Sequence, residues 1–80
     1  MTFISVGIMK VEESSARAKY AFGDPPGRVL GHVVIHKADG KIELLDITDE
    51  KYRHLLPFIK KRLVELHELG EYPENTHYHA

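Results

Sequence analysis

The residues of this chain best suited to chemistry are its histidines, because an imidazole can move a proton near neutral pH or bind a metal ion. The six histidines are His32, His36, His54, His67, His77 and His79. His32 and His36 are four residues apart on one expected strand, which is about 13 Å and too far for one metal ion to touch both. We therefore predict surface histidines, with no metal or other cofactor. Metal capture by the closely spaced His77 and His79 is the alternative.

Glu43 is the carboxylate that can orient one of these imidazoles. The expected hairpin pairing places Glu43 opposite His36, and a carboxylate that holds an imidazole is an arrangement suited to a general base. The same pairing is also a routine opposite-charge contact between neighbouring strands. A pocket lined by His32, His36 and Glu43 is therefore an alternative, in which the chain is a small enzyme or ligand-binding protein.

Other residue types that support catalysis are missing or badly placed. The chain has no cysteine, and its serines lack the sharp glycine-flanked turn that presents a nucleophilic serine. The glycines at positions 27 and 31 do not follow the G-x-G-x-x-G spacing that cradles a phosphate. We therefore predict no catalytic residues and favour a protein that is not an enzyme.

The elements that must position these residues are predicted as two β-hairpins followed by one helix. Alternating apolar and polar residues predict four strands: Phe3 to Val11, Ala16 to Phe22, Val29 to His36 and Lys41 to Ile47. Pro25 and Pro26 form a stiff connection between the two hairpins. The predicted class is α+β, with a four-stranded antiparallel sheet and one C-terminal helix on one face.

The second hairpin is predicted to turn at Asp39-Gly40, because a two-residue type I′ turn needs positive φ at both central residues. That register places Val34 opposite Leu45, and a bulged loop would shift the pairs by one. One face of the hairpin then holds Val33, Ile35, Ile42 and Leu44. The other face holds Leu30, His32, Val34, His36, Glu43, Leu45 and Ile47.

The helix is predicted to begin at an N-cap, Thr48, and to end before the C-cap glycine, Gly70. Its apolar stripe consists of Tyr52, Leu55, Leu56, Ile59, Leu63 and Leu66, as a helix lying on a sheet requires. Pro57 falls inside this pattern, and because the stripe continues in phase we favour one kinked helix over two separate helices. Residues 71–80 are expected to be a partly flexible tail.

One helix can cover only one face of the sheet, so the apolar residues of the other face need a different cover. These residues are Leu30, Val34, Leu45 and Ile47. Contiguous exposed apolar surface on a small protein usually marks an interface, and a twofold dimer is the commonest arrangement. We therefore predict a non-enzymatic protein-interaction module that acts as a homodimer. The alternative is that the tail or the first hairpin covers this face.

Composition limits the remaining classes of function. The 80 residues form one domain, spanning 1–80. Eleven lysines and arginines stand against 12 acidic residues, whereas a nucleic-acid binder usually shows a basic excess. No apolar run approaches the ~20 residues that cross a membrane, and no signal peptide is evident. We therefore expect a cytoplasmic protein that binds neither nucleic acid nor membranes.

Overall fold

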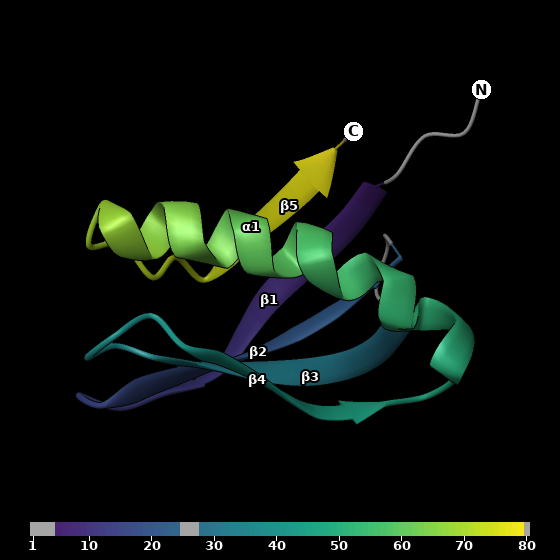
Figure 1. The fold of residues 1–80 in the computed structure, drawn as a ribbon, viewed down its shortest axis with the longest axis horizontal. Helices are drawn as coiled ribbons and strands as arrows, with labels where there is room; N and C mark the ends of the chain where they lie inside the picture. Colours follow the sequence, from purple (N-terminus) through teal and green to yellow (C-terminus); the bar gives the residue numbers. More distant parts are fainter. Residues whose placement is uncertain (1–4, 25–27, 80) are drawn as a thin grey trace.

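A computed structural model describes residues 5–24 and 28–79, which form two layers, a β-sheet and a helix lying across one of its faces (Figure 1). The elements in chain order are β1 (Ser5–Glu13), β2 (Arg17–Asp24), β3 (Arg28–His36), β4 (Ile42–Ile47), the 3₁₀ helix η1 (Glu50–Leu55), the α-helix α1 (Leu56–Glu68) and β5 (Asn75–His79). This arrangement confirms the predicted α+β class. The expected strand start at Phe3 and the proline pair at 25 and 26 lie outside the described residues.

The sheet has five strands in the order β4-β3-β2-β1-β5, and each neighbouring pair is antiparallel. The prediction of four strands is therefore wrong, because β5 forms in the expected tail and pairs with β1. Contacts with α1 hold this polar strand in place. Arg62 Nε donates a hydrogen bond of 2.9 Å to Thr76 Oγ1, and the rings of Phe58 and Tyr78 lie 5.3 Å apart between centroids.

Sheet and helix share one apolar core. Its buried members are Val6, Ile8, Ala18, Tyr20, Phe22, Leu30, Val33 and Ile35 from the sheet and Leu56, Ile59 and Leu63 from α1. The predicted helical stripe is confirmed, since its α1 members are buried and Tyr52 and Leu55 pack against the core. Full burial of one such side chain stabilises the fold by about 1.5–3 kcal/mol.

The start of the helix differs from the expectation in two respects. Asp49, not Thr48, is the N-cap residue, and its carboxylate accepts a hydrogen bond of 3.0 Å from the Lys51 amide. Thr48 still belongs to the sheet, because its amide donates to the Leu30 carbonyl. The expected kink at Pro57 is a change of helix type: η1 runs into α1, and Pro57 lies in the first turn of α1, where its missing N–H costs no hydrogen bond.

The end of the helix is as predicted. Gly70 has φ of 72°, and its amide donates to the His67 carbonyl while the Glu71 amide donates to Leu66. This pair of bonds is the Schellman arrangement, in which glycine takes the left-handed position after the helix. The chain then returns to the sheet, where the Tyr20 hydroxyl donates a hydrogen bond of 3.0 Å to the Pro73 carbonyl.

The β3–β4 hairpin has a longer loop than predicted. The Gly40 amide donates to the His36 carbonyl, the His36 amide donates to Lys41, and Gly40 alone carries positive φ, at 75°. Val34 therefore lies opposite Glu43 rather than Leu45, a shift of two positions. An even shift leaves each side chain on its predicted face, because strand side chains alternate with a period of two. The predicted face with Val33 and Ile35 is accordingly the one that α1 covers.

Two β-bulges correct the predicted placement of Leu30 and Ile47. The β2–β3 ladder shifts beside Leu30 and the β3–β4 ladder shifts beside Leu45, so each strand holds one extra residue there. As a result Leu30 is 2% exposed within the core, and Ile47 packs against it. A bulge changes which face the following side chains take, which the alternation pattern alone does not reveal.

Candidate functional site

The candidate site is the sheet face that α1 leaves uncovered, here called the open face. Its side chains are Met9, Glu12, Arg17, Lys19, Ala21, Val29, His32, Val34, His36, Glu43, Leu45 and Asp46. They alternate with the core residues along each strand, and the bulge places both Leu45 and Asp46 on this side. Of the four residues predicted as an interface, Val34 and Leu45 are therefore on the open face, while Leu30 and Ile47 are not.

Charge is separated across the open face. Arg17 and Lys19 belong to β2, whereas Glu43 and Asp46 belong to β4, with β3 between them. Within residues 5–24 and 28–79, neither the Lys19 ammonium nor the Arg17 guanidinium makes a hydrogen bond or an ion pair. β2 and β4 lie about 10 Å apart because one strand separates them. The open face therefore presents a positive strip on β2 with carboxylates on both sides of it, Glu12 on β1 and Glu43 and Asp46 on β4.

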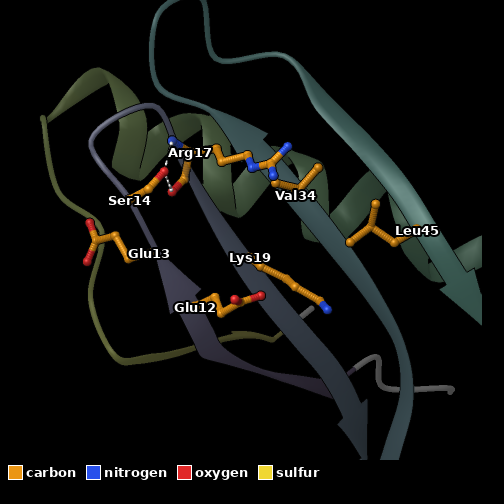
Figure 2. A pocket seen from close by; sticks show the side chains of 7 residues that line it. All are labelled: Glu12, Glu13, Ser14, Arg17, Lys19, Val34 and Leu45. Carbon is orange, nitrogen blue, oxygen red and sulfur yellow. Dashed lines mark hydrogen bonds between the residues drawn. The ribbon is translucent and has the colours of Figure 1, made fainter.

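A shallow hollow of about 300 Å³ lies on the open face beside the β1–β2 turn (Figure 2). It is lined by Glu12, Glu13, Ser14, Arg17, Lys19, Val34 and Leu45. Val34 is only 5% exposed, whereas Leu45 is 48% exposed. Figure 2 shows these side chains coming from β1, β2, β3, β4 and the turn between β1 and β2, with Leu45 on the strand at the edge. The hollow thus combines Val34 and the projecting Leu45 with two basic side chains, Arg17 and Lys19, and two acidic ones, Glu12 and Glu13.

The histidines of β3 are each held by a carboxylate of β4. Asp46 Oδ1 accepts a hydrogen bond of 2.8 Å from His32 Nδ1, and Glu43 Oε1 accepts one of 3.0 Å from His36 Nε2. The His36–Glu43 contact was predicted, although it forms diagonally because Glu43 lies opposite Val34. The His32–Asp46 contact was missed, because only the bulge brings Asp46 opposite His32.

These two pairs do not converge on one reacting centre. The four-residue separation of His32 and His36 along β3 is about 13 Å, and none of the predicted pocket residues His32, His36 and Glu43 lines the hollow. Among the described residues no group of three or more metal-binding side chains is close enough to hold one ion. His77 lies in β5, opposite Gly7.

A second charged cluster lies at the turn end of the two hairpins and serves the fold. The Glu13 carboxylate accepts from Lys10 Nζ at 2.6 Å and from Lys37 Nζ at 2.7 Å. These two ammonium groups lower the pKa of Glu13 to about 2. Lys10 also donates to the Tyr72 carbonyl at 2.8 Å, and Lys37 lies over the Tyr72 ring. The cluster therefore joins both hairpins to the segment that leads into β5.

Comparison of the chain with protein-family models, with curated proteins and with solved structures finds no match. Within the described residues, no helix has the length and apolar character needed to cross a membrane.

Proposed function

We propose that this protein is a non-enzymatic binding module that acts as a homodimer through the open face of its sheet. The observation that carries the proposal is the apolar surface left on that face. Met9 on β1 and Leu45 on β4 are 47% and 48% exposed, whereas Ala21 and Val34 on the strands between them are nearly buried. Burying such surface against a second chain removes apolar area from water.

The charge pattern of the open face favours a second copy as the occupant. The positive strip on β2 and the negative strip on β4 are complementary to one another, so the face is complementary to itself. Twofold dimers use the same patch on both chains and therefore require this property. The small size of the domain adds a thermodynamic reason, because a core on one side of a sheet is thin and association extends it.

The test is the mass of the protein in solution. Light scattering and sedimentation at high micromolar concentration should give twice the chain mass of 9.2 kDa. Leu45→Lys should reduce the mass to that of one chain, because it places a charge in the apolar centre of the interface. Leu69→Lys is the matched control, since Leu69 is 71% exposed at the far end of α1. A wild-type mass of 9.2 kDa at these concentrations would refute the proposal.

The alternative function is a small ligand-binding protein or enzyme that uses the imidazoles of β3. The supporting observation is that His32 and His36 are each hydrogen-bonded to a carboxylate, the arrangement that orients an imidazole for proton transfer. A working imidazole should titrate away from the ordinary value of ~6.5 in an NMR pH series. If both imidazoles titrate at that ordinary value, this alternative loses its support.

A further inference from the structure

We propose that in this dimer the twofold axis runs parallel to β3, between two stacked sheets, so that β4 of each copy lies over β2 of the other. This inference rests on the proposed dimer and adds its geometry, its ion pairs and its apolar contact. Stacked sheets pack about 10 Å apart with their strands within about 30° of parallel, which fits such an axis.

The cross-strand register fixes which residues meet. Lys19, Val34 and Glu43 lie in one row across β2, β3 and β4. Rotation by half a turn about an axis along β3 keeps each residue at its height along the strands and exchanges the two sides of the sheet. Val34 then meets Val34 of the second copy, and each Lys19 meets Glu43 of the second copy. Within the described residues Glu43 contacts only an imidazole, and Lys19 makes no ion pair even with Glu12, which lies opposite it on β1.

The same row argues against neighbouring positions of the axis. An axis along β2 places Lys19 over Lys19 of the second copy. An axis between β2 and β3 places Glu43 over Glu12 of the second copy, because Glu12 is the β1 member of this row. Like charges in direct contact across an interface are strongly unfavourable. In the row of Lys19, Val34 and Glu43, only the axis along β3 among these three positions brings opposite charges together. In the next row, at the turn end of the hairpins, it brings Arg17 near Lys41 of the second copy.

Leu45 supplies the apolar contact in this arrangement. It stands on β4 as the extra residue of the bulge between the rows of Val34 and His32. The rotation carries it over β2 of the second copy, beside Lys19, where the hollow of about 300 Å³ lies. Each copy therefore inserts its half-exposed leucine into the other copy's hollow. Met9 lies on β1, outside the three overlapping strands.

The decisive experiment is a charge exchange between β2 and β4. Glu43→Lys places lysines at both ends of each ion pair, and Lys19→Glu places glutamates there, so each single variant should raise the dimer dissociation constant at least about tenfold. Mixing the two variants should restore association as a heterodimer, because both of its pairs are again Lys with Glu. Native mass spectrometry with one chain isotope-labelled distinguishes the heterodimer from either homodimer.

Two controls separate geometry from damage to the fold. Glu65→Lys and Lys61→Glu make the same charge changes on exposed positions of α1 and should leave the dissociation constant unchanged. The double variant Lys19→Glu, Glu43→Lys should dimerise with itself, because each pair is reversed and complete. Recovery in the mixture also shows that the single variants are folded.

The outcomes distinguish this inference from the proposed function. If the wild type is a dimer and the single variants dimerise equally well, or if mixing restores nothing, the axis along β3 is wrong while the dimer stands. If the wild type is a monomer, both proposals fail. A comparison of Leu45→Lys with Met9→Lys gives an independent check. The axis along β3 predicts that Leu45→Lys weakens association much more, whereas an axis along β2 carries Met9 over β3 of the second copy and predicts comparable losses.

Discussion

On the covered face of the sheet Tyr20, Phe22 and Val33 are at most 1% exposed beneath α1, whereas on the open face Met9 and Leu45 keep nearly half of their surface. Both faces belong to the same strands, so strand propensity does not explain the difference. The covered face meets an apolar helix stripe, and the open face combines apolar side chains with separated charge. The comparison teaches that packing within the chain specifies one face, whereas the described residues leave the large apolar side chains of the other face half-exposed. Four predictions test this contrast.

The largest effect is expected from a cavity under the covered face. Ile59 is fully buried at the centre of the contact between α1 and the sheet. Ile59→Ala should lower the free energy of unfolding by about 2–5 kcal/mol, because it removes buried methyl groups and leaves a void. Urea denaturation followed by circular dichroism measures this loss. A loss below about 1 kcal/mol would contradict the assignment of this face as the core.

The next effect is expected where the sheet has no room for a side chain. A Cβ at Gly31 would lie 2.5 Å from the Asp46 carbonyl oxygen and 2.6 Å from the Phe22 ring. Gly31→Ala should therefore cost about 1–3 kcal/mol of unfolding free energy, because β3 and the ring must move apart. The same urea titration measures it. If Gly31→Ala leaves stability unchanged, the close approach of the Phe22 ring to β3 is not as described.

A smaller effect is expected from the charged cluster around Glu13. Since Lys10 and Lys37 lower the pKa of Glu13 in the folded state to about 2 from 4.5, the folded state binds this proton less readily than the unfolded chain. The cluster therefore stabilises the fold above pH 4.5, and this stabilisation is lost as the pH falls toward 2. Melting temperatures measured from pH 6 to pH 2 should fall more steeply for the wild type than for Glu13→Gln.

Comparing the wild type with Glu13→Gln also isolates the contribution of Glu13, because both proteins contain all the other carboxylates. The pKa of Glu50 is likewise lowered, by its hydrogen bond with Arg53, but that contribution is the same in wild type and variant. Equal slopes for the two chains would mean that Glu13 is not paired with Lys10 and Lys37 in solution.

The smallest effect on stability is expected on the open face. Leu45→Ala should change the unfolding free energy by no more than about 0.5 kcal/mol at protein concentrations where light scattering reports a monomer, because Leu45 is half exposed. The measurement is thermal or urea unfolding of the dilute protein. A loss as large as that of Ile59→Ala would mean that Leu45 is already covered within one chain, and the contrast between the two faces would then disappear.

Sequence alone predicted the parts of the fold that have a strong periodic signal. The helical stripe from Tyr52 to Leu66 and the C-cap at Gly70 were predicted, because each depends on local spacing. The covered face of the second hairpin was also predicted correctly even though its register was not. The longer loop shifted the pairing by two positions, and an even shift keeps each side chain on its predicted face.

The parts that were missed depend on contacts that no local pattern encodes. β5 is polar, and it is ordered by Arg62 and Phe58 of α1 rather than by an apolar face of its own. The bulges beside Leu30 and Leu45 change the faces of Leu30 and Ile47, and they are features of the pairing between strands that alternation along one strand does not show. For the candidate site, the sequence therefore supplied Val34 and Leu45 but not the row that joins Lys19 to Glu43.

The bulge at Leu45 gives β4 one residue more than its pairing with β3 uses. Leu44 lies opposite Val33 and Asp46 lies opposite His32, so Leu45 has no residue of β3 of its own. Removing this one residue leaves a regular ladder in which each remaining pair of β3 and β4 keeps its partner. The sheet can form without Leu45. Deleting this residue would leave the pairing of β3 and β4 intact but would remove a half-exposed leucine from the open face. Leu45 is therefore an extra residue of β4 whose half-exposed side chain adds to the open face and not to the ladder.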